Sequence, residues 1–409
     1  MKTSQLKTDF KNLRVPYALA VHGVEEEKAV LKVLKSHKTQ EGKNTTNFEI
    51  KAAELFGKKY GIMTNSGSSA NLLAIELLNL KPGSEVITPI LTFSTTLAPL
   101  IQKRLKPVFV DVELGSYQIQ VDAISEAINK NTKALLIPLL IGNIPDMKKL
   151  RNIADEYGLF FIEDSCDTLG GKYDWQPTGT YSDISTTSFY GSHIITAAGG
   201  GGMLCLNDKL WDRRARILRG WGRTSSSNET ENINIRFSSK LNGNIPYDSK
   251  FIFEEIGYNF RPLEISAAFG LEQLKKLKKF TAIRKRNFNE LTKSLSKYTD
   301  VFSLPVQSQK VETSWLAYPI LIKENAPFTR HEIVSYLEKN NVQTRPVFTG
   351  NILYQPAFRH IMHKDTKKSY TNANNITKNA FLIGCHHGMR SEHIEKLKLL
   401  FEGFLGKFK

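Results

Sequence analysis

The segment YGIMTNSGSSANLLAIELLNL, residues 60–80, contains the pattern that decides the fold. A short apolar run gives way to a turn of serine and glycine, and a helical run rich in leucine and alanine follows. This order of strand, turn and helix leaves backbone N–H groups unpaired at the N-terminus of a helix, where they suit a phosphate group. Gly67 and Ser68 lie in the turn, which an ordinary helix cap explains better when the segment is taken alone.

Strand-like and helical runs alternate along the following residues. The apolar runs with the length of buried strands are EVITPI (85–90), KPVFVDV (106–112), KALLIPLL (133–140), GLFFIEDS (158–165) and GGGMLCL (200–206). Helices are predicted at 24–34, 47–56, 147–157, 263–296 and 391–404. The alternation predicts an α/β fold in which helices cover both faces of a mostly parallel sheet.

Changes in composition suggest how the chain is divided. Residues 223–250 are rich in serine and asparagine, which is typical of a long loop or an insertion. We expect a large domain at 1–280, which includes an N-terminal helical segment and this insertion. A small C-terminal α/β domain is expected at 281–409.

Composition argues against several classes of protein. The 409 residues, 41% of them hydrophobic, can bury a large core, and the net charge of +16 comes from scattered lysines without a recognition motif, so we expect no nucleic acid partner. The longest apolar run, 134–142, is too short for a membrane span of roughly 18 residues, and residues 1–14 lack the apolar stretch of a secretory signal. Three widely separated cysteines, Cys166, Cys205 and Cys385, predict reduced thiols and a cytoplasmic location.

Four stretches together resemble the DegT/DnrJ/EryC1/StrS family of nucleotide-sugar aminotransferases. They are NSGSSAN, IEDSCDTLGG, TTSFYGSH and GYNFRPLEISAA, and they follow the order of the family over nearly the whole chain. The resemblance implies the fold type I of pyridoxal phosphate enzymes, with a large domain and a small C-terminal domain. It also implies a homodimer with shared active sites.

The resemblance assigns cofactor contacts to several residues. Gly67, Ser68 and Ser188 match ligands of the cofactor phosphate, and Asn259 matches an asparagine that reaches this phosphate from the partner subunit. Asp164, at the end of an apolar strand, matches the carboxylate that pairs with the pyridine nitrogen and keeps it protonated.

The other implied contacts are less firmly placed. Phe93 matches an aromatic residue that stacks on the cofactor ring, although a buried core phenylalanine is the alternative. Asp167 stands where many family members have glutamine or histidine near the phenolic oxygen, which weakens its assignment. Arg219 and Arg345 are candidates for binding a substrate carboxylate or diphosphate, or else for surface or structural ion pairs.

His193 stands where the resemblance places the cofactor lysine. A lysine holds the cofactor covalently and moves protons, whereas a histidine can move protons but cannot form that bond. The same replacement marks the sugar 3-dehydratases of the family, which act in 3,6-dideoxysugar biosynthesis for structures such as the O-antigen of lipopolysaccharide. His193 is therefore expected to be a catalytic base with a pKa near its ordinary value of roughly 6.5.

The implied reaction begins when glutamate converts pyridoxal phosphate to pyridoxamine phosphate. The amino form then condenses with the C4 ketone of a nucleotide-linked 4-keto-6-deoxyhexose, and the C3 hydroxyl leaves after His193 removes a proton. Ammonia and 2-oxoglutarate are released, so the amino group is consumed and not transferred. Without the lysine, ordinary aminotransfer is the weakest alternative.

Two kinds of 3-dehydratase are open to comparison. One acts on a CDP-sugar with a cysteine-bound [2Fe–2S] cluster and a reductase, and the other has no cluster and uses glutamate. A cluster normally needs four thiolates, and the three cysteines here include none in the insertion, so we expect no cluster and no other metal. The insertion nevertheless resembles the CDP kind through PYDSKFIFEEIGYN, residues 246–259, which leaves the nucleotide open among GDP, CDP and dTDP. A reductase-coupled enzyme and a non-catalytic nucleotide-sugar-binding protein remain alternatives.

Overall fold

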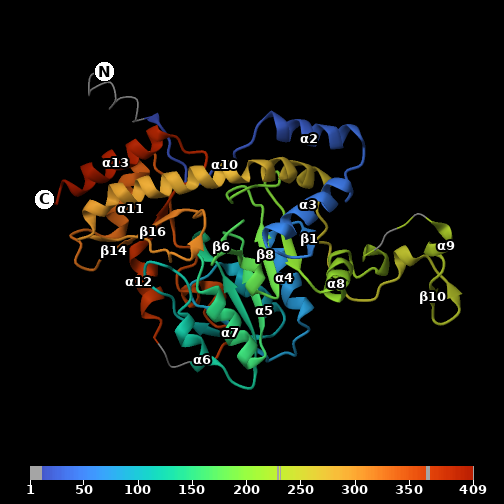
Figure 1. The fold of residues 1–409 in the computed structure, drawn as a ribbon. Coiled ribbons are helices and arrows are strands. Elements are labelled where there is room, and N and C mark those ends of the chain that lie inside the picture. The colour runs from blue at the N-terminus through green and yellow to red at the C-terminus, as the bar shows by residue number, and fades with distance from the viewer. Residues whose placement is uncertain (1–11, 228–229, 231, 365–368, 409) are drawn as a thin grey trace.

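A mixed seven-stranded sheet forms the centre of the larger part of the molecule (Figure 1). The computed structural model describes residues 12–227, 230, 232–364 and 369–408. The strands are β1 (Tyr60–Thr64), β2 (Glu85–Pro89), β3 (Lys106–Val110), β4 (Thr132–Pro138), β5 (Phe160–Asp164), β8 (Ile184–Ser188) and β9 (Gly202–Leu206), in the order β1-β9-β8-β5-β4-β2-β3. Strands β3, β2, β4, β5 and β8 are parallel neighbours, and β9 runs antiparallel to both of its neighbours, β1 and β8. The predicted mostly parallel sheet is confirmed.

Helices cover both faces of this sheet because successive strand side chains point to opposite sides. Leu136 and Ile162 face one side and pack in a cluster with Leu73 of α4 (Gly67–Leu77). Leu135 and Phe161 face the other side, in a cluster with residues of α7 (Met147–Tyr157). The other helices around the sheet are α3 (Lys43–Leu55), α5 (Ser94–Gln102), α6 (Ile124–Ala127) and α8 (Lys209–Arg219). Each large apolar side chain buried in these clusters contributes about 1.5–3 kcal/mol.

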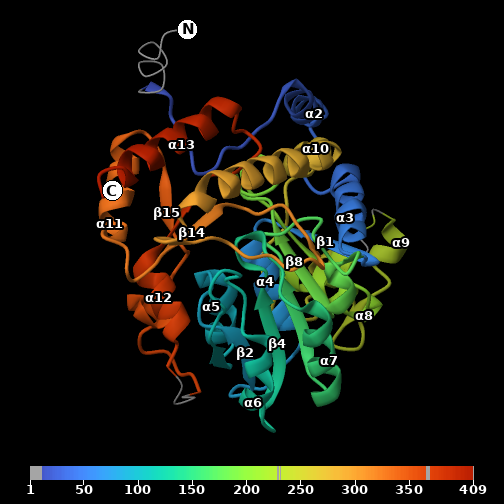
Figure 2. The ribbon, with the colours of Figure 1, turned by 60° about the vertical axis from the view of Figure 1, so that its left-hand side comes forward.

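The small domain is built on a four-stranded antiparallel sheet. Its strands are β12 (Phe302–Ser303), β14 (Tyr318–Ile322), β16 (Ala380–Ile383) and β15 (Thr344–Pro346), and its helices are α11 (Arg330–Lys339), α12 (Thr371–Asn379) and α13 (Ser391–Leu405). Helix α10 (Glu264–Leu295) passes without a break through the predicted boundary at 280–281 and connects the two parts (Figure 2). The boundary stays a prediction. Val15 pairs with Val342, however, so the first described residues join the small domain and not the large one.

The predicted N-terminal helix is present as α2 (Val24–Lys35), which lies beside α10 (Figures 1 and 2). Its contact with α10 is polar at the centre, because buried Glu26 accepts hydrogen bonds from Gln273 and from Lys276, each at 2.7 Å. Leu31 and Leu34 are about half exposed. The apolar periodicity therefore predicted correctly that a helix forms here, but it did not predict which side chains of the helix are buried.

The insertion forms short elements that project from the main body as an arm (Figure 1). They are α9 (Ile233–Arg236), the hairpin of β10 (Lys240–Leu241) and β11 (Ile245–Pro246), and 3₁₀ turns at Thr224–Ser227 and Ser249–Phe251. Asn242 and Gly243 both have positive φ, which is the geometry of a tight hairpin turn, so the Asn-Gly pair was an available signal. A further antiparallel sheet joins β6 (Lys172–Tyr173), β7 (Gln176–Pro177) and β13 (Val311–Glu312). No helix in the described ranges is long and apolar enough to cross a membrane.

Candidate active site

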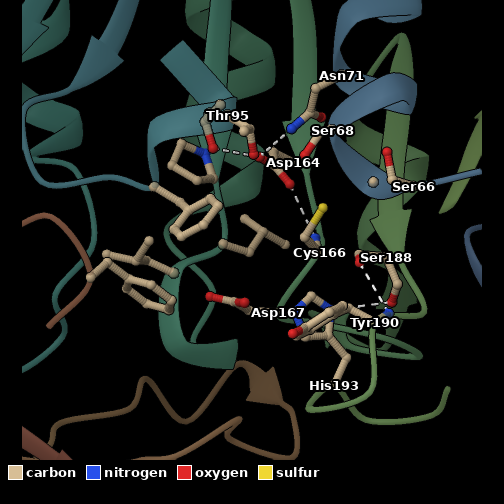
Figure 3. A pocket seen from close by; sticks show the side chains of 17 residues that line it. Ser66, Ser68, Asn71, Thr95, Asp164, Cys166, Asp167, Ser188, Tyr190 and His193 are labelled. Atoms are coloured by element: carbon tan, nitrogen blue, oxygen red, sulfur yellow. Dashed lines mark hydrogen bonds between the residues drawn. The ribbon is translucent and has the colours of Figure 1, made fainter. Parts of the chain in front are cut away.

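A cavity of about 350 Å³, the main cavity, opens where the parallel strands end (Figure 3). Pro138, Asp164 and Ser188 are the last residues of β4, β5 and β8 and line it together. The carboxyl ends of parallel strands are the usual ligand site of such sheets. Seven of the residues expected at the cofactor line this cavity: Gly67, Ser68, Phe93, Asp164, Asp167, Ser188 and His193.

The N-terminus of α4 forms an anion cradle at one end of the main cavity. Ser66 caps the helix by accepting a hydrogen bond from the Ser69 N–H at 3.1 Å. The N–H groups of Gly67 and Ser68, in the first helical turn, have no intrahelical acceptor. A Cβ on Gly67 would lie 2.6 Å from Ser188 Cβ, so only glycine leaves room between this turn and the end of β8.

Asp164 is buried and held by three donors. Its Oδ2 accepts hydrogen bonds from Asn71 Nδ2 at 2.8 Å and Thr96 Oγ1 at 2.7 Å, and its Oδ1 accepts one from the Cys166 N–H at 3.1 Å. Both oxygens of this side chain therefore accept hydrogen bonds from protein donors. Sequence reasoning missed Asn71 and Thr96. Asn71 could have been predicted from the sequence, because it lies one helical turn after Gly67 in the NSGSSAN stretch.

Asp167 faces the cavity in a different environment. Within the described residues, the donor that contacts its carboxylate is the Ile141 N–H, at 2.9 Å from Oδ2. Ile141 has φ of 60°, a strained conformation for a β-branched residue. Burial raises the pKa of Asp167 to about 7, and the nearby Asp164 charge adds to this. Asp167 is therefore partly protonated near neutral pH.

His193 lies in the loop after β8 and points into the main cavity beside Tyr190 (Figure 3). Its backbone N–H donates to the Tyr190 carbonyl at 3.0 Å, and its Nδ1 lies 3.3 Å from the Ser188 carbonyl oxygen. Burial lowers the pKa of this imidazole to about 4. The expectation of an ordinary pKa near 6.5 is therefore wrong, because surrounding protein atoms replace the water that would stabilise the charged form.

Phe93 lies at the mouth of the main cavity. It is 48% exposed, and its ring meets that of Phe348 edge to face, with 6.0 Å between ring centroids. The alternative of a buried core phenylalanine is therefore wrong. An exposed aromatic ring at a cavity rim is free to stack on a flat ligand.

A second cavity of about 670 Å³, the outer cavity, adjoins the first and shares Phe93, Tyr190, His193 and Phe348 with it. Arg345 lines the outer cavity and lies over the ring of Tyr17, 5.5 Å from its centroid. No carboxylate in the described part of the chain pairs with Arg345, so its guanidinium is available to an anionic ligand.

Arg219 lies elsewhere and corrects the expectation of a substrate contact. Its side chain is buried, and it donates to Glu49 Oε1 and Glu41 Oε2, both at 2.9 Å, and to the Met63 carbonyl at 2.7 Å. Because two carboxylates already pair with this guanidinium, it is not available to bind an anionic ligand. Arg219 therefore holds the packing of α8 against the segment that contains β1.

Asn259 lies at the base of the arm, where its backbone bridges to Gly220. It is exposed and lines neither cavity of its own chain. Its assignment as a phosphate ligand supplied by a partner subunit stays a prediction.

Comparisons with known proteins agree with this site. Residues 21–398 match the model of the DegT/DnrJ/EryC1/StrS aminotransferase family. The lipopolysaccharide biosynthesis protein RfbH of Salmonella typhimurium is 37% identical, over 89% of this chain and 86% of that protein. A GDP-4-keto-6-deoxy-D-mannose 3-dehydratase of Yersinia pseudotuberculosis is 33% identical, over 94% and 97%. A solved GDP-4-keto-6-deoxymannose 3-dehydratase with a trapped PLP-glutamate geminal diamine superposes with a TM-score of 0.85 at 28% identity, covering 94% of this chain and 99% of that one.

The residues of the main cavity fit pyridoxal phosphate, the cofactor of this family. The cradle at Gly67 is the space that a Cβ would fill, and it joins two free N–H groups to the Ser188 hydroxyl. Asp164 supplies a charged partner for a pyridinium nitrogen. This fit, the fold and the match over residues 21–398 together establish that the chain belongs to the DegT/DnrJ/EryC1/StrS aminotransferase family.

Proposed function

We propose that this enzyme catalyses the glutamate-dependent removal of the C3 hydroxyl from a nucleotide-linked 4-keto-6-deoxyhexose. The observation that carries the proposal is that His193 lies in the main cavity, and the family resemblance assigns the cofactor lysine to this position. Within the described residues no lysine lines either cavity, so no amine is available to bind the cofactor covalently. A neutral imidazole in this place favours proton transfer without aminotransfer.

Pyridoxal phosphate, when bound, supplies an electron-accepting ring that stabilises negative charge on the adjoining carbon. Asp164, which Asn71 and Thr96 hold in place, would supply the carboxylate that pairs with the pyridine nitrogen of that ring. The N–H groups of Gly67 and Ser68 and the Ser188 hydroxyl would hold its phosphate. These contacts orient the ring and keep the reacting atoms near the imidazole.

The geometry around His193 favours one tautomer. The Ser188 carbonyl oxygen can only accept, so Nδ1 carries the hydrogen and donates to it. Nε2 then has a free lone pair and accepts the proton from the substrate or cofactor carbon. The low pKa of His193 keeps this nitrogen unprotonated at neutral pH.

The outer cavity is the proposed site for the nucleotide part of the substrate. Arg345 has no carboxylate partner in the described ranges and faces this cavity, where a diphosphate would supply one. The shared wall at Phe93 and His193 places a sugar between the two cavities. The choice among GDP, CDP and dTDP depends on contacts to the base that no motif identifies.

We also propose that the active form is a homodimer in which Asn259 completes the phosphate site of the partner subunit. Asn259 is exposed next to an arm that presents apolar side chains such as Ile233 and Phe253 to solvent. A mixed dimer of His193→Asn and Asn259→Ala chains tests this, because shared sites leave one intact site in each mixed dimer. Recovered activity on mixing supports sharing, whereas no recovery places both residues in sites of a single chain.

The test of the reaction is an incubation of the purified protein with pyridoxal phosphate, glutamate and a panel of nucleotide-linked 4-keto-6-deoxyhexoses. Ammonia, 2-oxoglutarate and the mass of the sugar are followed together, with no reductase added. Loss of the C3 oxygen with release of ammonia supports the proposal. An amino sugar product refutes it in favour of aminotransfer, and deoxygenation that depends on an added reductase supports the CDP-type alternative.

A further inference from the structure

Arg284 is a buried cation whose partners are all neutral groups. It lies on α10 and is 1% exposed, and no carboxylate among the described residues forms an ion pair with it. Burial lowers the pKa of this guanidinium to about 10, so it is still charged at neutral pH. A buried charge without a counter-ion is costly, which makes the groups that it contacts informative.

One contact of Arg284 is with the loop that carries His193. Nη2 donates to the His193 carbonyl oxygen at 3.3 Å. The same loop is held on its other side by the His193 N–H bond to Tyr190 and by the ring contact with Ser188. The backbone of the proposed base is therefore held by hydrogen bonds on two sides, and the bond from Arg284 is the one that comes from outside the loop.

A second contact leads towards Asp167, another titratable group of the main cavity. Nη1 donates to the Leu316 carbonyl at 3.0 Å, and the Leu316 N–H donates to the Ile141 carbonyl at 2.8 Å. The N–H of Ile141 in turn donates to Asp167. Arg284 thus connects the His193 loop with the strained turn that holds Asp167.

A third contact leads to the small domain. Nε donates to His387 Nδ1 at 3.2 Å, and the His387 ring stacks on Phe280, with centroids 3.9 Å apart. Burial lowers the pKa of His387, so its ring is neutral and can accept this hydrogen bond. Phe280 lies one helical turn before Arg284 on α10, so helix and small domain are joined at the same point.

We infer that Arg284 is a positioning residue, which fixes His193 and the Asp167 turn relative to each other and ties both to the small domain. It lines neither cavity and acts through the backbone carbonyls of His193 and Leu316 and through the ring of His387. This inference rests on the proposed role of His193 as the base. A shift of the base by about 1 Å can cost about 100-fold in rate, although binding contacts are intact.

The test compares Arg284→Met, Arg284→Lys and, as a matched control, Arg330→Met. Like Arg284, Arg330 donates to neutral groups among the described residues, in its case the carbonyls of Thr377 and Ala380, but it lies in the small domain and lines neither cavity. The first measurement is the absorbance change when glutamate converts the cofactor in the loaded enzyme, which yields a rate constant and an apparent Kd for glutamate. The second is the pKa of His193 by NMR in the protein without cofactor, assigned with His193→Asn.

Arg284→Met is expected to lower the rate constant about 100-fold while the Kd values for glutamate and the cofactor stay nearly unchanged. Its His193 pKa should rise, because a neighbouring positive charge is lost. The other charged or titratable groups that line the cavities with His193 are Asp164, Cys166, Asp167, Tyr190, Tyr17 and Arg345, and none of them is altered. Arg284→Lys keeps the positive charge but loses the planar set of guanidinium donors. The rate constant should therefore fall while the pKa of His193 stays unchanged.

Unchanged rate constants in both Arg284 variants would overturn the inference. So would a loss of rate that follows a loss of cofactor affinity and is matched in Arg330→Met, since this pattern marks general destabilisation. If Arg284→Met does not fold, the rate and pKa of Arg284→Lys decide. The glutamate step requires no sugar and the NMR titration requires no reaction, so both are readable even if the proposed dehydration fails.

Discussion

Replacement of Gly67 by alanine tests whether the turn before α4 is the phosphate cradle. The new Cβ would lie 2.6 Å from Ser188 Cβ and 2.8 Å from Cys166 Sγ, whereas ordinary contacts begin at 3.4 Å. Ser188 must therefore move away by about 0.8 Å, or the helix terminus must shift by a similar amount. Either movement separates the free N–H groups of the turn from the Ser188 hydroxyl.

The cost has two parts. Overpacking of this kind destabilises the fold by about 1–3 kcal/mol. A hydrogen bond to a charged group contributes about 1.5–3 kcal/mol, so the loss of one phosphate contact weakens cofactor binding by roughly 10- to 100-fold. The second effect is specific to the cofactor, and the first is measurable without it.

The assay is a titration of the protein with pyridoxal phosphate, followed by absorbance, together with thermal unfolding of the protein without cofactor. Gly200→Ala is the control, because the nearest atom to its new Cβ is the Asn65 carbonyl oxygen at 3.8 Å. Gly200 belongs to the loop that precedes β9 on the same side of the sheet. Wild-type affinity in Gly67→Ala, or equal weakening in Gly200→Ala, would refute the assignment.

Three further predictions concern buried carboxyl groups. Asp164→Asn places an amide against two donors and removes the charge, so glutamate-driven conversion of the cofactor should slow about 100-fold in stopped-flow measurements. Asp167 loses its proton as pH rises through about 7, so Asp167→Asn should abolish any change in kcat between pH 6 and 8 that depends on this group. Burial also raises the pKa of Glu163 to about 7, so the folded protein holds this proton more tightly than the unfolded chain does. The resulting contribution to the free energy of unfolding is fully present below about pH 4.5 and is lost as the pH rises through about 7. Glu163→Gln should therefore be more stable than wild type at pH 8, by about 3 kcal/mol at most, with the gap shrinking toward pH 5 in urea unfolding.

The fold was largely predictable because its signals are local. The strand ending at Asp164 and the helix at 147–157 were readable from apolar runs and spacing, and the structure has both with these bounds or close to them. Two features were not readable. The antiparallel direction of β9 and the pairing of Val15 with the small domain depend on contacts between distant segments, for which no local pattern exists.

The site was predictable where a motif fixes the residue and unpredictable where partners decide its role. Gly67, Ser188 and His193 converge on one cavity as expected. Arg219 shows the limit, because its type suits a substrate anion, yet Glu41 and Glu49, which lie far away in sequence, occupy its guanidinium. Arg345 has the same side chain and no such partner in the described ranges.

The low pKa of His193 bears on how the base is activated. A base with a pKa of about 4 is unprotonated at neutral pH but accepts protons weakly, since each pKa unit costs about 1.4 kcal/mol. The Ser188 carbonyl lies beside its Nδ1, and the Ser188 hydroxyl faces the proposed phosphate cradle. Because negative charge near an imidazole raises its pKa, a bound phosphate should strengthen this base. The proposed base, His193, should then be weak when the site is empty, mainly because of burial and in smaller part because of the positive charge of Arg284, and stronger when the phosphate is bound.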